Sequence, residues 1–271
     1  MHVVSGKSRL FALAGVAAVA VAGCAGDGQS GIPTETPEPP AASETVEPGT
    51  TPTTAQAPAV TIGEVPGNPD AAAALEPWLT DLVAGRDVVS QCWTIAPERA
   101  AAMYTDVDAI TAAVRQPGRD GQYTVTWSAN GTDVSVLRSE ITSGYACPYV
   151  HPTGEDATTG DDAVHVVTRF LARATGEPLS PSDTEKQYRL VCDERAIWDP
   201  WGTGSPSVPP LSTNPDVLDD VTTFDAASAI FAPLDDVYGS VTIPVVEAGA
   251  TRDLVVYVTT GSNGYCLGAV D

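Results

Sequence analysis

One pattern of elements occurs twice between Asp70 and the C-terminus, and it constrains the fold of this chain more than any other feature. In each copy an amphipathic helix stops at a glycine, a segment follows that ends in a cysteine, and a β-hairpin then leads to a second cysteine. The matching helix ends are residues 77–86 and 168–177. The pattern predicts two tandem α+β units, each with helices and an antiparallel sheet. The alternative is a chance match among short segments rich in Ala and Thr.

The first predicted unit covers residues 70–153. Apolar residues at helical spacing predict a helix over 71–83, ending at Gly85, and a second helix over 97–114 that opens at Pro97. Strand-like segments over 123–127 and 133–142 flank Asn130-Gly131, a pair typical of a tight hairpin turn.

The second predicted unit covers residues 154–271. Asp161 and Asp162 are suited to cap an amphipathic helix that ends at Gly176. A strand over 187–191 is expected to lead into Cys192, and a loop rich in Pro, Gly and Ser occupies 198–215. Helical stretches over 217–231 and a hairpin of strands around 241–243 and 254–260 complete the unit.

The N-terminus has the features of a secretion signal. Lys7 and Arg9 precede an apolar run of 13 residues, Leu10 to Ala22, which is shorter than the ~20 residues needed to span a bilayer. The run ends in Val21-Ala22-Gly23-Cys24, which resembles the lipobox of bacterial lipoproteins. The resemblance implies that residues 1–23 are removed and that Cys24 is lipidated, on the outer face of the cytoplasmic membrane. The alternatives are an ordinary signal peptide cut near Ala22 and a buried hydrophobic helix.

Residues 24–69 are expected to form a disordered tether after the lipidated cysteine. The segment is rich in Pro, Thr, Glu and Ala, and it has too few large aliphatic residues to offset the entropy of ordering. Its prolines favour an extended spacer. The scarcity of lysine and the abundance of Ala, Thr, Asp, Gly and Pro resemble proteins of high-GC actinobacteria.

Four cysteines remain after Cys24, an even number that predicts two disulfides in an exported protein. Three pairings are open from the count alone, and the repeat selects Cys92–Cys147 and Cys192–Cys266. A zinc site is the alternative, but no cysteine pair has metal-binding spacing and histidine is scarce. No metal or other cofactor is therefore expected.

A helix that ends in Ala84-Gly85-Arg86 or Thr175-Gly176-Glu177, followed by a curved antiparallel sheet, resembles the cystatin-like cone of the nuclear-transport-factor-like superfamily. The resemblance covers residues 70–271 as two units. It implies a pocket between helix and sheet in each unit. Because that superfamily includes both enzymes and non-catalytic domains, it implies no reaction.

The most site-like stretch is the loop that contains Trp198, Asp199 and Trp201. Two tryptophans in a Pro/Gly loop can line a groove for a sugar or a peptide, with the carboxylate orienting hydroxyl groups. The alternative is that the loop folds its tryptophans over a small core or into the contact between the units. The other tryptophans, Trp78, Trp93 and Trp127, lie in periodic contexts and are predicted to be core residues.

Residues typical of catalysis are sparse. In the processed chain only His151 and His165 remain; His165 is suited in principle to act as a base, but a solvated helix-surface position is favoured. No familiar zinc-protease, esterase or penicillin-binding motif occurs. Adjacent acids are interpreted as helix caps and solvated surface. These acids are Asp106, Asp108, Asp161, Asp162, Asp193, Glu194, Asp219, Asp220, Asp235 and Asp236.

The net charge of −22 repels nucleic acid, which is therefore excluded as a partner. The expected function is a non-catalytic binding or accessory module of the cell envelope, with an envelope protein, a peptide or a glycan as ligand. One alternative is an envelope hydrolase or carbohydrate-active enzyme that uses carboxylates near Trp198 and Trp201. The other is a spacer or surface antigen.

Overall fold

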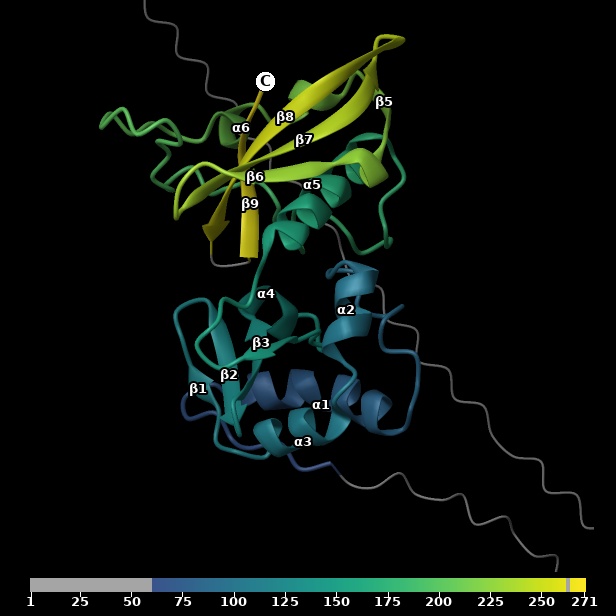
Figure 1. The fold of residues 1–271 in the computed structure, drawn as a ribbon, viewed down its shortest axis with the longest axis vertical. Coiled ribbons are helices and arrows are strands. Elements are labelled where there is room, and N and C mark those ends of the chain that lie inside the picture. The colour runs from purple at the N-terminus through teal and green to yellow at the C-terminus, as the bar shows by residue number, and fades with distance from the viewer. Residues whose placement is uncertain (1–59, 262–263) are drawn as a thin grey trace, which may run out of the picture. The chain divides into compact units, whose positions relative to one another are not determined.

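The structure, a computed structural model, describes residues 60–261 and 264–271 (Figure 1). The helices and two antiparallel sheets confirm the predicted α+β class. The signal peptide, Cys24 and the tether up to residue 59 lie outside the described residues. Within the described part of the chain, no helix combines the length and apolar character needed to cross a bilayer.

The first lobe, residues 60–153, has its helices ahead of a four-stranded sheet. Helix α3 lies against β2 and β3, and the buried Trp78 and Trp127 are the largest core side chains. The sheet is a meander in the order β1-β2-β3-β4. The elements are α1 (Pro69–Val83), α2 (Pro97–Met103), α3 (Val107–Val114), β1 (Arg119–Asp120), β2 (Thr124–Ala129), β3 (Thr132–Leu137), α4 (Arg138–Ile141) and β4 (Tyr149–Pro152).

Two predicted elements of the first lobe are shorter than expected. The helix predicted over 97–114 is split into α2 and α3, because the Asp106 side chain accepts a hydrogen bond from the Ala109 amide at 3.0 Å and starts a new helix. The strand predicted over 133–142 ends at Leu137, where the chain turns into α4. The turn itself is confirmed, with positive φ at Asn130 (52°) and Gly131 (84°).

Residues 60–69 belong to the first lobe, so the predicted boundary at Asp70 is too late. The Gly63 amide donates to the Val114 carbonyl at 2.7 Å, and Trp127 Nε1 donates to the Gly63 carbonyl at 2.9 Å. Val65 is buried in the lobe's core. An extended segment can pack against the lobe through backbone hydrogen bonds and one buried side chain. Amino-acid composition predicts neither of these contacts.

The second lobe, residues 154–271, packs the long helix α5 on its sheet. Strands β6, β7, β8 and β9 form a meander, and β5 pairs with the same edge of β7 as β6. The elements are α5 (Gly160–Ala174), α6 (Pro210–Thr213), η1 (Pro215–Leu218), β5 (Val221–Phe224), η2 (Ala226–Ser228), β6 (Ile230–Pro233), β7 (Tyr238–Glu247), β8 (Ala250–Gly261) and β9 (Gly264–Val270).

Three predictions for the second lobe are wrong in detail. The stretch over 217–231 contains strands β5 and β6, because the long strand β7 leaves an edge that β-branched residues can pair with. The strand over 187–191 reduces to one bridge between Val191 and Leu267. Thr159 caps α5, and Asp162 lies at the third helical position, where its carboxylate accepts a hydrogen bond from the Thr159 amide.

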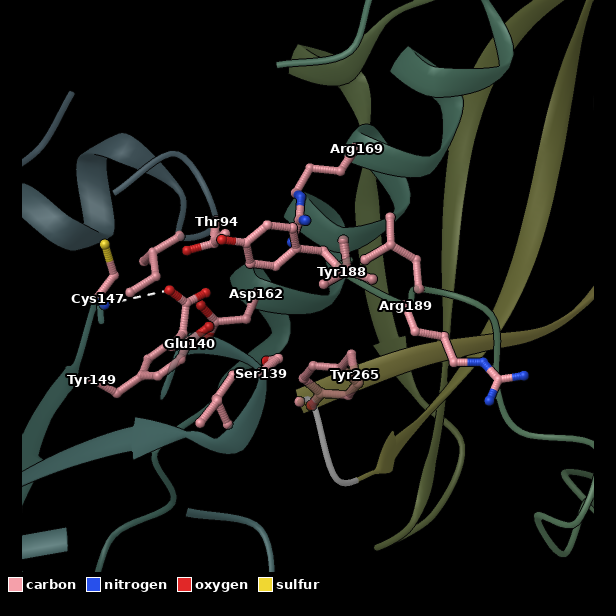
Figure 2. Close-up of a pocket in the computed structure, with 15 residues that line it drawn as sticks. Thr94, Ser139, Glu140, Cys147, Tyr149, Asp162, Arg169, Tyr188, Arg189 and Tyr265 are labelled. Carbon is pink, nitrogen blue, oxygen red and sulfur yellow. Dashed lines mark hydrogen bonds between the residues drawn. The ribbon is translucent and has the colours of Figure 1, made fainter. Parts of the chain in front are cut away.

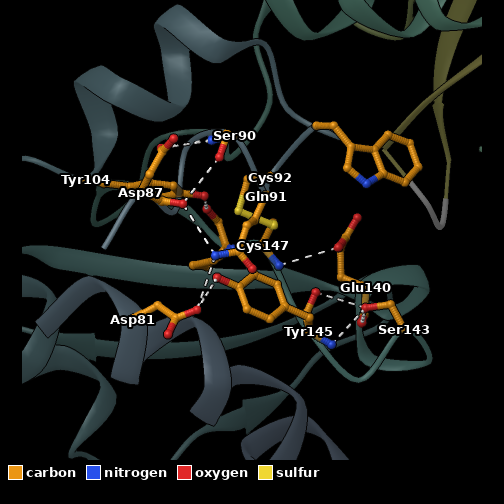
Figure 3. Close-up of a disulfide and its surroundings, with 12 residues drawn as sticks. Asp81, Asp87, Ser90, Gln91, Cys92, Tyr104, Glu140, Ser143, Tyr145 and Cys147 are labelled. Atoms are coloured by element: carbon orange, nitrogen blue, oxygen red, sulfur yellow. Dashed lines mark hydrogen bonds between the residues drawn. A yellow bond between two sulfur atoms is a disulfide. The ribbon is translucent and has the colours of Figure 1, made fainter. Parts of the chain in front are cut away.

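Both disulfides are present, and they join the pairs that the repeat selects. The Cα atoms are 5.5 Å apart in Cys92–Cys147 and 4.9 Å apart in Cys192–Cys266. The bonds close loops of 55 and 74 residues, and the chain-entropy model assigns such loops about 4 kcal/mol of stabilisation each. Figure 3 shows Cys92–Cys147 with the Glu140 side chain close by.

Candidate functional site between the two lobes

The loop predicted as a ligand site does not gather its three residues around one cavity. Trp198 is 1% exposed and packs its ring edge-on against Tyr238, with the ring centroids 5.3 Å apart. It also lies so close to Gly268 that a Cβ there would come within 2.2 Å of the ring. Trp198 is therefore a core residue, which agrees with the alternative interpretation of this loop.

The other two residues of that loop serve the loop or face solvent. The Asp199 carboxylate accepts hydrogen bonds from the amides of Thr203 at 2.9 Å and Gly204 at 2.8 Å. The hydrogen bond from the Thr203 amide is the main reason that the pKa of Asp199 lies below its usual value. Trp201 is 60% exposed and touches Tyr257 edge-on. Both oxygens of the Asp199 carboxylate thus accept hydrogen bonds that stabilise its own loop.

The two histidines occupy different environments. His165 is buried, and its Nε2 lies 2.9 Å from the Trp93 carbonyl, so the expectation of a solvated histidine is wrong. Burial lowers the pKa of His165, so the neutral imidazole donates from Nε2 to that carbonyl. The sequence pattern missed this because α5 faces the first lobe as well as its own sheet.

His151 and Ser135 form a pair with the spacing of a base and a nucleophile. His151 Nε2 lies 3.0 Å from Ser135 Oγ, and His151 Nδ1 lies 3.1 Å from the Pro152 carbonyl. Ser135 is only 2% exposed, so its hydroxyl is covered and has no access to a substrate. The pair continues a row of hydrogen-bonded hydroxyl groups on the sheet, in which Thr124 contacts Thr126 and Thr126 contacts Ser135.

A small cavity lies where the lobes meet, and both lobes belong to one compact part of the chain. It has a volume of about 20 Å³, enough for a group the size of one water molecule. The first lobe contributes Thr94, Glu140 and Tyr149 to its wall, and α5 contributes Asp162 and Arg169. In Figure 2 the carboxylates of Glu140 and Asp162 face the same space. This space is called the inner cavity below.

Glu140 is a buried carboxylate without an ion-pair partner among the described residues. It is 4% exposed, and it accepts one long hydrogen bond, of 3.4 Å, from the Cys147 amide. Burial raises its pKa to about 7, although the Thr94 hydroxyl, the Cys147 amide and the charge of Arg169 act in the opposite direction. The cost of desolvation therefore outweighs the effect of these neighbouring groups on the pKa.

Asp162 is only half satisfied. Its Oδ2 accepts from the Thr159 amide at 2.6 Å and lies 3.1 Å from Nε of Arg99. Its Oδ1 is buried and has no hydrogen-bond partner among the described residues, and the same is true of the Thr94 hydroxyl oxygen. Burial raises the pKa of Asp162 despite these contacts.

The neighbouring arginines are committed to other acids. Nη2 of Arg169 donates to Asp183 at 2.8 Å, and its guanidinium stacks 4.9 Å above the Trp93 ring. Arg173 also pairs with Asp183, and Arg99 pairs with Asp162. Within the described part of the chain, Glu140 is therefore the acid of this buried cluster that forms no ion pair.

A wider groove adjoins the inner cavity, and the two share Leu137, Gly264 and Tyr265 in their walls. Its volume of about 470 Å³ is within the range typical of small-molecule sites. Among the residues that the structure describes, its lining includes four aromatic residues and three acids and contains no lysine, arginine or histidine. These residues are Tyr123, Phe231, Tyr238, Tyr265, Asp156, Asp235 and Asp236.

Tyr265 lies between the charges of the two spaces. Burial raises its pKa, and the charges of Asp162, which lines the inner cavity, and Asp156, which lines the groove, raise it further. Its ring meets Phe231 edge-on, with the centroids 6.1 Å apart. The groove and the inner cavity are neighbouring spaces that share Tyr265 in their walls, and the two together are called the interlobe site below.

Sequence patterns did not single out the residues of this site. The sequence places Glu140 within a predicted strand and Asp162 at a predicted helix cap. In the described part of the chain, no three His, Cys, Asp or Glu side chains converge as a metal site. Comparison with known proteins finds no matching family model, no matching curated protein and no matching solved structure.

Proposed function

We propose that this chain is a lipoprotein anchored through Cys24 to the outer face of the cytoplasmic membrane, and that its folded head is a non-catalytic binding module of the cell envelope. The groove of about 470 Å³ between the lobes carries the proposal of binding. It combines aromatic faces with carboxylates, which is the composition expected of a site that orients a small ligand. The lipobox at Val21-Ala22-Gly23-Cys24 supports the anchor.

Binding is favoured over catalysis by the access to each reactive group. The buried carboxylates Glu140 and Asp162 face a space of about 20 Å³, which is too small for a scissile bond with its flanking groups. The covered hydroxyl of Ser135 and the loop-bound carboxylate of Asp199 are equally unsuited to attack a substrate. No second function is favoured by a specific contact.

We further propose that the lobes are two diverged copies of one cystatin-like unit. In support, both contain a four-stranded meander, β1 to β4 and β6 to β9, with a helix packed against it. In both, the second cysteine of the disulfide lies close to or within the last strand. An experimental structure in which these strands superpose in sequence order would support common origin, and a different strand order in either lobe would contradict it.

The binding proposal is tested by filling the groove. Thr260 is an exposed residue of β8 that lines it, and Thr251 is an exposed residue at the other end of the same strand. Thr260→Trp should abolish binding of small fragments detected by saturation-transfer NMR, whereas Thr251→Trp should keep it. Fragments that bind both variants equally, or a complete lack of fragment binding to the unmodified chain, would contradict a ligand site in the groove.

The anchor is tested separately from the groove. Replacing Cys24 with serine removes the thiol that accepts the lipid, so the protein should move from the membrane fraction to the soluble fraction of the producing cells. Mass spectrometry of the unmodified chain should show an acylated Cys24 as its first residue. A Cys24→Ser protein that stays in the membrane would contradict lipid anchoring at this residue.

A further inference from the structure

We infer that the inner cavity receives a primary ammonium group at the end of a flexible aliphatic chain, and that the rest of this ligand lies in the groove. The inference rests on the proposed binding function and assigns the chemical class of the ligand. Three acceptors carry it: the Glu140 carboxylate, Asp162 Oδ1 and the Thr94 hydroxyl oxygen all line the inner cavity. An ammonium group has three N–H donors and no acceptor, which matches that set.

The size of the inner cavity selects among cations. A volume of about 20 Å³ accepts one small group such as an ammonium nitrogen with its hydrogens. A planar guanidinium is several atoms wide and does not fit. Carboxylate or phosphate groups would face two buried carboxylates and be repelled.

The buried carboxyl groups of the inner cavity favour a cation over a neutral hydrogen-bond donor. A single water can satisfy Asp162 Oδ1 and Thr94, but it gives Glu140 no ion-pair partner, so this buried carboxyl keeps its proton up to about pH 7, whereas a bound cation favours its ionised form. Arg99, Arg169 and Arg173 form ion pairs with Asp162 and Asp183 and none with Glu140. A cation brought by the ligand completes the cluster.

The groove suits the rest of such a ligand. Tyr265, Phe231 and Tyr238 offer aromatic surface for methylene groups and for cation–π contact. Asp156 and Asp236 are exposed, line the groove and make no hydrogen bond among the described residues. A second positive charge further along the chain would lie near these free carboxylates.

The shared chemistry belongs both to a free polyamine and to a lysine side chain of a peptide. The probes are therefore spermidine and the tripeptide acetyl-Gly-Lys-Gly-amide, titrated by calorimetry into the full-length chain in detergent. Diacetylspermidine, whose end nitrogens are uncharged amides, is the matched control ligand. At least one of the two ammonium probes should bind at least about tenfold more tightly than the control. The tighter of the two probes identifies the source.

The variant pair is Glu140→Gln and Glu98→Gln. Glu98 is exposed in α2 outside the groove, so its substitution makes the same change of charge elsewhere on the first lobe. Glu140→Gln should weaken binding of the preferred probe at least about tenfold, and Glu98→Gln should leave it unchanged. Equal loss in both variants would indicate general attraction to an acidic surface and would overturn the inference.

Two further measurements separate the possible failures. Thermal unfolding of Glu140→Gln establishes that the variant is folded, and the double variant Asp156→Asn/Asp236→Asn tests the groove without a buried change. If fragments bind the groove but neither ammonium probe displaces them, the ligand class is wrong and the binding function stands. If fragments also fail to distinguish Thr260→Trp from Thr251→Trp, the binding function fails as well.

Discussion

The loop around Trp198 and the interlobe site both contain carboxylates and aromatic rings, but these residues differ in their hydrogen bonding and in whether they line a cavity. In the loop, both carboxylate oxygens of Asp199 are occupied by backbone amides. At the interlobe site, no described residue donates a hydrogen bond to Asp162 Oδ1, and Glu140 accepts one long hydrogen bond. The aromatic residues differ in the same way, since Trp198 is buried in a core whereas Tyr265 lines two adjoining spaces.

This comparison shows that residue type is a weak indicator of a binding site. A carboxylate whose oxygens already accept hydrogen bonds from its own loop stabilises that loop and offers few free acceptors to a ligand. A buried carboxylate with spare capacity beside a cavity costs free energy until something binds it. Unsatisfied capacity at a cavity is therefore the more informative feature.

The largest expected effect concerns the two tryptophans of the loop. Trp198→Ala removes a fully buried ring and should lower the free energy of unfolding by about 3–5 kcal/mol. Trp201→Ala removes an exposed ring and should cost less than about 1 kcal/mol. Urea unfolding of both variants measures the difference. Equal costs would break the distinction between a core tryptophan and a surface tryptophan.

The next effect concerns Glu140 and depends on pH. Its pKa is raised to about 7 in the folded protein, so between the unfolded value near 4.5 and pH 7 the folded state keeps a proton that the unfolded state has lost. Stability from this group is therefore lost as pH rises through that window, by about 3 kcal/mol in total.

Glu140→Gln removes that pH-dependent term. The variant should be more stable than the unmodified protein by about 2–3 kcal/mol at pH 8, with the gap closing below about pH 4.5. Glu98→Gln is the control, and chemical unfolding at several pH values is the measurement. A gap that is the same at pH 4 and pH 8 would show that Glu140 is not a strained buried acid.

The smallest effect separates loop support from ligand binding. Asp199→Ala removes acceptors for the Thr203 and Gly204 amides and should lower the melting temperature slightly, with no change in ligand binding at the groove. Asp156→Asn should have the reverse outcome, because that carboxylate makes no hydrogen bond among the described residues. Thermal unfolding and calorimetry on the two variants test both halves. Loss of ligand binding in Asp199→Ala would contradict the conclusion that this loop takes no part in ligand binding.

Local patterns predicted most elements and missed those that depend on a partner. Helix α1, the Asn130-Gly131 turn and the hairpin of β7 and β8 follow from periodicity and turn residues. Strands β5 and β6 do not, because they form only against the edge of β7. The same holds for residues 60–69, which dock through backbone hydrogen bonds to Val114 and Trp127.

The sequence by itself determined the α+β class, the position of most helices and strands, and the choice of cysteines that pair. These follow from periodicity, turn chemistry and a repeated order of elements, all of which are properties of neighbouring residues. Only the tertiary structure decided which carboxylates are left unsatisfied. The burial and pairing of Glu140 and Asp162 depend on residues that are distant in the sequence, from Thr94 to Tyr265. A local sequence pattern cannot predict that these residues contact one cavity.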